Sequence, residues 1–128
     1  MRRAKSSLSL SRRPRLPPEA DGAAAGRTAA NRTELAGRLL ERGNLRYTPA
    51  GIPAIEFRIA HVSEQSEAAA SRRVECELAC VALGTLALLL KEAGPGTELV
   101  VSGFLASRSL KQRSPVLHAT RIEFTEQI

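Results

Sequence analysis

The chain has 128 residues, of which 43% are hydrophobic, and a formal net charge of +6 at pH 7. This length gives room for one hydrophobic core of ordinary size and for no second folded domain, and no apolar run reaches the roughly 20 residues of a membrane-spanning helix. Seven basic and two acidic residues give +5 in residues 1–30, whereas twelve basic and eleven acidic residues give +1 in residues 31–128, so the total charge says little about what the folded part binds.

Residues 1–30 are predicted to form a disordered, basic N-terminal extension. They combine arginine, serine and proline with an alanine–glycine run, and they hold too few large apolar side chains to offset a backbone ordering cost of about 1–2 kcal/mol per residue. The segment lacks the continuous apolar stretch of a secretory signal. An organellar transit peptide and a translation start placed too far upstream are alternatives that remain open.

The first two strands are expected at residues 34–41 and 52–60, with a turn at residues 48–51. The turn reads Thr-Pro-Ala-Gly, in which proline presets the second position and glycine accepts the chain exit. The second strand alternates apolar and charged residues, which is the period of a half-buried strand, and Gly37 marks a bend or bulge in the first. The side chains expected in the core are Leu35, Leu39, Ile55, Phe57 and Ile59.

The middle of the chain predicts a loop, a strand and a helix. Residues 63–71 have little to bury and are expected to form a flexible hairpin loop, which a third strand at residues 72–82 follows. Thr85 is predicted to cap a short helix that Gly94–Pro95 ends. Leucines lie around most of the helix circumference, which predicts that the helix is a buried plug.

The two cysteines, Cys76 and Cys80, lie on the same face of the predicted third strand. At about 3.3 Å per residue their Cα atoms are about 13 Å apart, which is beyond the reach of a disulfide. Because no second cysteine pair or histidine cluster offers zinc ligands, we expect buried structural thiols in a reducing, cytoplasmic compartment.

Two further strands, at residues 98–105 and 116–124, are joined by a loop at residues 107–115. Five strands with one short helix between the third and the fourth predict an all-β fold, the five-stranded OB-fold Greek-key barrel. An OB-fold binds oligonucleotides across its second and third strands and in the loops that follow the first and fourth. Residues 31–128 are therefore predicted to be a single-stranded DNA-binding domain.

Positive charge gathers in one part of this domain. No acidic side chain lies between Glu98 and Glu123, and the loop in that interval carries Arg108, Lys111 and Arg113. Three cations on one loop can follow a phosphate backbone, so these residues are the principal predicted DNA contacts. The alternative is a solvated loop whose charge serves only solubility.

Five more residues are candidate contacts because they precede the first turn or lie on the face where an OB-fold places its ligand. They are Arg46, Tyr47, Arg58, Arg72 and Arg73. The ring of Tyr47 is expected either to stack on a base or to pack on the barrel rim. Phe57, Phe104 and Phe124 are expected in the core because they sit on apolar faces at strand period.

Enzymatic activity is not predicted. His61 and His118 are the only histidines, and both fall on predicted strands where a structural role is expected. The chain has no nucleophile motif, no metal-ligand spacing and no glycine-rich phosphate loop, so neither a metal nor a cofactor is expected.

Motifs spread over the folded part match those of a known family. They are Asn31-Arg32, Leu35-x-Gly37, Thr48-Pro49-Ala50-Gly51-Ile52-Pro53, His61-Val62-Ser63, Cys76-Glu77-Leu78, Gly103-Phe104-Leu105 and Val116-Leu117-His118-Ala119. Together they resemble the bacterial primosomal replication protein N (PriB) family, over residues 31 to about 124. The Arg-Tyr-Thr-Pro-x-Gly turn is shared with bacterial single-stranded DNA-binding proteins generally.

This resemblance implies a homodimeric OB-fold protein that binds single-stranded DNA and joins the PriA helicase in restarting stalled replication forks. Primosomal protein DnaT and the single-stranded DNA-binding protein are the further partners that it implies, and no membrane is involved. Where relatives carry a tryptophan on the third strand for base stacking, this chain has Glu75. We therefore expect weaker and more electrostatic DNA binding than in those relatives.

Two other hypotheses accompany the leading one. Glu75 and Glu77 lie on the expected DNA face, which favours a protein-interaction module that docks the helicase with little DNA binding of its own. A small nuclease is a third, minor hypothesis.

Overall fold

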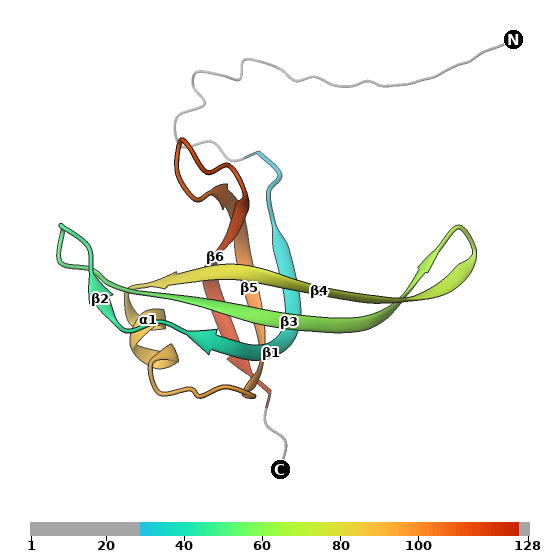
Figure 1. Cartoon of the computed structure of the whole chain (residues 1–128), viewed down its shortest axis with the longest axis horizontal. Helices are drawn as coiled ribbons and strands as arrows, with labels where there is room; N and C mark the ends of the chain where they lie inside the picture. Colours follow the sequence, from blue (N-terminus) through green and yellow to red (C-terminus); the bar gives the residue numbers. More distant parts are fainter. Residues whose placement is uncertain (1–28, 126–128) are drawn as a thin grey trace, which may run out of the picture. The chain divides into compact units, whose positions relative to one another are not determined.

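The computed structural model describes residues 29–125. Nearly all of the predicted extension at residues 1–30 lies outside this range, so that prediction stays open. The described chain forms β1 (Thr33–Arg42), β2 (Arg46–Tyr47), β3 (Pro53–Glu67), β4 (Ala70–Leu83), α1 (Thr85–Leu90), β5 (Glu98–Ser107) and β6 (Pro115–Phe124), as Figure 1 shows. Among residues 29–125, no helix has the length and apolar character needed to cross a membrane.

Five long strands close into a barrel (Figure 1). The hydrogen-bonded order is β1-β5-β6-β4-β3, and β1 pairs with β3 as well, which closes the ring. All of these pairings are antiparallel except β4 with β6, which is parallel. The short β2 lies along β3, and α1 follows the third long strand, β4. The predicted OB-fold barrel, with one helix between its third and fourth long strands, is confirmed.

The alternating strand pattern fills the barrel as expected. Leu39, Ile55, Phe57 and Ile59 are all at most 2% exposed, and Leu35 packs against them from a partly buried position. Burying each such side chain contributes about 1.5–3 kcal/mol. The side chains at the alternate positions of β3 consequently face outward, where they can contact a ligand.

The first strand, β1, pairs with two neighbouring strands. Its first half pairs with β5 and its second half with β3. At the switch, a Cβ on Gly37 would lie 2.5 Å from the Ala60 carbonyl oxygen, so only glycine allows the strands to approach this closely. The sequence predicts a bend or bulge at Gly37, but the register shift of this strand lies further along, between Leu39 and Glu41.

The predicted turn at residues 48–51 is confirmed. The Gly51 N–H donates to the Thr48 carbonyl oxygen at 2.7 Å, and Gly51 has a φ of 84°, which glycine adopts without a steric penalty. The turn holds β2 against β3, so it fixes the positions of Arg46 and Tyr47 at the barrel surface.

The prediction of a flexible loop at residues 63–71 is wrong. β3 and β4 remain paired as far as Glu67 and Ala70, and they extend beyond the barrel as a hairpin arm (Figure 1). The turn residues Ala68 and Ala69 have φ values of 52° and 64°. The strands of this arm need no core, because ladder hydrogen bonds and polar cross-strand pairs such as Glu67–Arg72, at 3.0 Å, connect them.

Two predictions about the helix need correction. Thr85 is the first helical residue, and Gly84, with a φ of 73°, occupies the cap position without any side-chain cap. The helix buries Ala87 and Leu90, but Leu89 is 52% exposed. A helix of six residues turns its leucines in all directions, so only one side can face the barrel.

The cysteines differ in environment. Both are free thiols, but Cys80 is buried and Cys76 is exposed, so the expected burial holds for Cys80 alone. Burial raises the pKa of the Cys80 thiol from 9.0 to about 12, although the nearby positive charge of Arg58 lowers this pKa in part. Because the thiolate is the reactive form, Cys80 stays unreactive at neutral and mildly alkaline pH.

A thiol reagent at pH 8 should therefore modify one cysteine of the native protein, Cys76, and both after denaturation. Mass spectrometry of the labelled protein measures this directly, and Cys76→Ser should abolish native labelling. Fast native modification of Cys80 would contradict its placement in the barrel core.

Candidate nucleic-acid interface

The loop between β5 and β6, residues 108–114, is exposed at every position. Its tip is a defined turn, since the Ser109 N–H donates to the Gln112 carbonyl oxygen at 3.0 Å and the Gln112 N–H donates to the Ser109 Oγ at 2.9 Å. Leu110 lies within this turn and is 92% exposed. The loop thus presents both an apolar tip and its cations to solvent.

Lys111 and Arg113 carry the available charge of this loop. Within residues 29–125 neither side chain takes part in an ion pair or hydrogen bond. Arg108 differs, because its Nη1 lies 3.4 Å from the Oε1 of Glu56 on β3. The three predicted contacts of the loop therefore differ. Lys111 and Arg113 can bind a phosphate directly, whereas Arg108 must first leave the carboxylate of Glu56.

The other four predicted arginines are each paired with a carboxylate. The pairs are Arg46–Glu56 at 3.0 Å, Arg58–Glu77 at 3.1 Å, Arg72–Glu67 at 3.0 Å and Arg73–Glu75 at 2.7 Å. Exposed ion pairs of this kind contribute only about 0–1 kcal/mol, so a phosphate can exchange for the carboxylate. The positive charge of the face is nevertheless largely cancelled in the free protein.

The predicted contacts do not form one cluster. Arg72 lies opposite Gln65 in the arm, seven residues along β3 from Arg58, which corresponds to about 23 Å at strand rise. Arg46, Arg58 and Arg108 lie over the barrel, where Glu56 lines the same hollows as they do. Arg72 and Arg73 could reach only a ligand long enough to run from the barrel onto the arm.

Tyr47 is 61% exposed at the end of the short β2. It pairs through its backbone with Pro53, and most of its ring faces solvent. Of its two expected environments, the structure gives the open one rather than packing on the rim. An exposed tyrosine beside Arg46 offers one face on which a base can stack.

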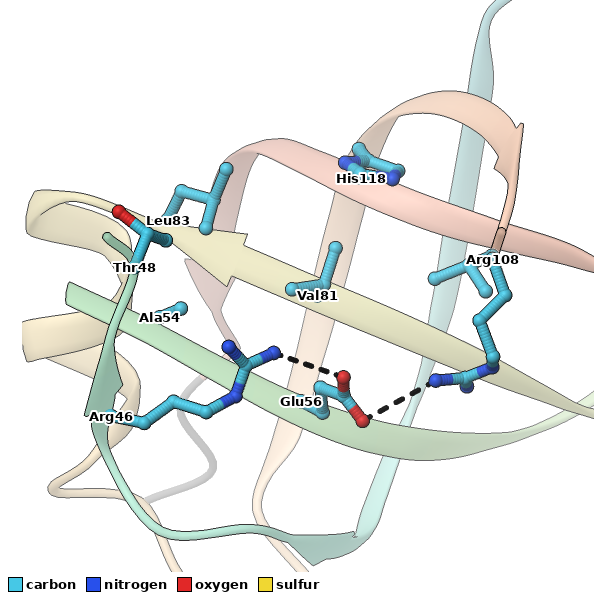
Figure 2. A pocket seen from close by; sticks show the side chains of 9 residues that line it. Arg46, Thr48, Ala54, Glu56, Val81, Leu83, Arg108 and His118 are labelled. Atoms are coloured by element: carbon cyan, nitrogen blue, oxygen red, sulfur yellow. Dashed lines mark hydrogen bonds and ion pairs between the residues drawn. The ribbon is translucent and has the colours of Figure 1, made fainter. Parts of the chain in front are cut away.

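A pocket of about 220 Å³ lies on the outer face of β3, β4 and β6 (Figure 2), and we call it the Glu56 pocket. Its lining includes Arg46, Thr48, Glu56, Val81, Leu83, Arg108 and His118. Figure 2 shows the two arginines reaching Glu56 from opposite sides. Two guanidinium groups share one carboxylate here, so the rim keeps a net charge of +1.

The core prediction is wrong for two of the three phenylalanines. Phe57 is buried, but Phe104 and Phe124 are each 41% exposed. Phe104 stacks on His118, with ring centroids 5.1 Å apart and planes 7° apart. The parity of β5 gives the signal that could have found this: Leu99 and Val101 are buried, so Phe104, on the other parity, points outward.

His61 joins two strands. Its Nδ1–H donates to the Ala36 carbonyl oxygen of β1 at 2.7 Å, and its Nε2 lies 2.8 Å from the Ser63 Oγ, which donates in this tautomer. Both ring nitrogens are thus occupied by contacts within the fold, which is the structural role that the sequence predicts for His61.

Comparisons with known proteins agree with this architecture. A family model described as "another single-strand binding protein family" matches residues 31–121. The replication restart protein PriB of Bordetella pertussis is 48% identical over 95 residues, covering 72% of this chain and 89% of that protein. PriB of Nitrosomonas europaea is 34% identical, covering 72% and 87%.

The solved structure of a relative has the same fold. The structure of PriB from Ralstonia solanacearum at 1.8 Å superimposes with a TM-score of 0.70 and 36% identity, covering 77% of this chain and all of that one. Both the matched residues and the matched barrel fall on the folded part described above. This chain belongs to the PriB family of replication restart proteins, within the single-strand binding protein superfamily of OB-folds.

Proposed function

We propose that this protein binds single-stranded DNA as a non-enzymatic accessory of replication restart and that it stimulates the PriA helicase at stalled forks. Membership of the PriB family supports the proposal. The observation that carries the DNA-binding part is the exposed loop between β5 and β6, on which Lys111 and Arg113 have no carboxylate partner within the described residues. Such cations bind phosphates at low cost because no ion pair must first be broken.

The proposed DNA path runs over the barrel. It begins at Lys111 and Arg113 of the loop, crosses the rim of the Glu56 pocket, and ends at Tyr47 beside the first turn. The pocket rim supports this path, because Arg108 reaches it from the loop side and Arg46 from the turn side. Arg58 extends the path along β3, and a longer strand would reach the arm.

The proposed cellular setting follows from the family. We propose a cytoplasmic homodimer that works with PriA, DnaT and the single-stranded DNA-binding protein. The basic residues 1–30 are proposed to add affinity without sequence preference, because their net charge of +5 attracts any polyanion.

An unwinding assay tests the proposal. PriA is mixed with a forked DNA substrate, with and without this protein, and the rate of strand separation is measured. The expected result is faster unwinding with the wild-type protein and a smaller increase in the unwinding rate with the double variant Lys111→Ala, Arg113→Ala. Equal rates with and without the wild-type protein would contradict the helicase part of the proposal.

The ion pairs at the Glu56 pocket make a separate prediction. Glu56→Gln should raise the affinity for single-stranded DNA about three- to tenfold at low salt, because it releases Arg46 and Arg108 for phosphates. The dependence of affinity on salt should steepen, since each additional phosphate contact adds about 0.7 to the slope. Titration of a labelled oligonucleotide over a salt series measures both quantities.

Glu123→Gln is the matched control for this prediction. It makes the same change in net charge and frees Arg121, its partner on β6, which does not line the Glu56 pocket. Glu123→Gln should change the affinity for single-stranded DNA by no more than about twofold, because it alters only long-range electrostatic attraction, which salt screens. Equal gains from both variants would show that Glu56 acts through net charge alone.

A protein-interaction module is the second candidate function. It is favoured by the pairing of Arg46, Arg58 and Arg73 with carboxylates, which leaves much of the expected DNA face close to neutral. A pull-down with purified PriA, compared with oligonucleotide titration, separates the two functions. Micromolar helicase binding without measurable DNA binding would favour the second one.

A further inference from the structure

Side chains on neighbouring strands form a row across the outer face of the barrel, and the aromatic rings of this row end at His118 on β6. Phe104 on β5 and His118 on β6 are directly paired, and their rings stack nearly in parallel. The next residue across, opposite His118 on β4, is Val81, and the residue opposite Val81 on β3 is Glu56. Valine is too short to continue the row of rings.

The space above Val81 belongs to the Glu56 pocket. Val81 and His118 both line this pocket, and Figure 2 shows them on neighbouring strands with Glu56 beyond. Because neighbouring strands lie about 4.8 Å apart, a planar ring standing above Val81 would continue the Phe104–His118 stack at nearly the same spacing. The pocket volume of about 220 Å³ provides room for such a ring.

The charges around the pocket define the rest of the ligand. Arg46 approaches Glu56 from β2, and Arg108 approaches it from the loop between β5 and β6. Cations on two sides of a slot that is lined in part by Val81, Leu83 and Val116 suit a flat ring that is joined to an anionic group at each end. A base within a single strand has this chemistry, because a phosphate precedes and follows each nucleoside.

We infer that the Glu56 pocket takes one base of single-stranded DNA, which stacks on His118 while Phe104 supports the other side of the imidazole. The inference rests on the proposed function and deepens it by naming a base-binding site. It supplies a stacking surface on β6, on the proposed path of the DNA over the barrel. Arg46 and Arg108 are the phosphate contacts on either side of this base.

The test compares full-length variants on two probes, labelled oligo-dT and an abasic oligomer of the same length. His118→Leu should lower the affinity for oligo-dT about 5- to 160-fold, the range for loss of one base stack of about 1–3 kcal/mol. It should leave affinity for the abasic oligomer within twofold and the salt dependence unchanged, because no phosphate contact is lost. Phe104→Leu should act in the same direction with a smaller effect.

Two further variants serve as controls. Phe124→Leu removes an aromatic ring that is equally exposed, at 41%, on the same hairpin but outside the pocket, and it should bind both probes as the wild type does. His118→Phe keeps a planar ring, so it should retain oligo-dT binding. Thermal unfolding of each variant verifies that the barrel is intact.

The experiment distinguishes failure of the base pocket from failure of the proposed function. If His118→Leu binds oligo-dT like the wild type, or loses affinity for both probes equally, the base pocket is refuted while the proposed function stands. Loss of oligo-dT binding in His118→Phe would also refute stacking on this residue. A wild-type protein that binds neither probe would overturn the proposed function and the base pocket together.

Discussion

Replacing Lys111 and Arg113 together by alanine should lower the affinity for single-stranded DNA roughly 10- to 100-fold at low salt. Each side chain is exposed on the loop between β5 and β6 and has no ion-pair partner within the described residues, so each is free to neutralise a phosphate. The slope of log affinity against log salt should fall by about 1.4, because two fewer counterions are released. Fluorescence anisotropy over a salt series measures both effects.

The control variant removes the same charge elsewhere. Lys91 follows α1 and Arg121 lies on β6, and neither lines the Glu56 pocket. The double variant Lys91→Ala, Arg121→Ala should change affinity by less than about threefold, through long-range charge alone. An equal loss in both double variants would mean that the loop makes no specific contact with the DNA backbone.

Gly103→Ala should destabilise the barrel by roughly 3 kcal/mol. A Cβ at this position would collide with the His118 carbonyl oxygen and lie 2.8 Å from its carbonyl carbon. These are backbone atoms of the paired strand β6, so they cannot rotate away and the two strands must separate. Urea unfolding followed by circular dichroism measures the change, as a lower midpoint at an unchanged slope.

Gly43→Ala is the matched control for this substitution. A Cβ there would meet only the Glu56 carbonyl oxygen, at an ordinary contact distance of 3.6 Å, so stability should change by less than about 0.5 kcal/mol. A Gly103→Ala variant as stable as Gly43→Ala would show that β5 and β6 pair differently from the arrangement described here.

The barrel is predictable because its strands follow a simple rule. Ile55, Phe57 and Ile59 alternate with Glu56 and Arg58, and the structure buries the first set while Glu56 is exposed and Arg58 is half-buried. Alternation of this kind reports directly on a surface with one side toward the core. The order of the elements along the chain and the turn at residues 48–51 also follow from local signals, whereas the hydrogen-bonded order of the strands does not.

The β3–β4 arm could not be predicted in this way. Both of its faces are polar and meet solvent, so no alternation marks its strands. Its turn uses Ala68 and Ala69 at positive φ, where glycine or asparagine is the usual signal. What extends these strands is backbone pairing that begins inside the barrel, and a sequence window over residues 63–71 does not contain that information.

The candidate site was predictable only in its parts. The loop cations stand out because no acidic residue lies near them in sequence, but the partner of Arg108 is Glu56, 52 residues away. Phe104 is expected in the core because its neighbours suggest an apolar face at strand period, but the buried Leu99 and Val101 lie on the other parity, so Phe104 points outward. Contacts across the barrel depend on strand register, and the apolar pattern alone does not give it.

The most direct test of DNA binding by the barrel is an anisotropy titration of labelled oligo-dT over a salt series. It uses the full-length protein beside a version that begins at Asn31. The barrel account predicts that the shorter version still binds, with lower affinity and a shallower salt dependence than the full-length protein, because only the basic extension is lost. Binding by the full-length protein with none by the shorter version would assign DNA binding to residues 1–30 and contradict the account.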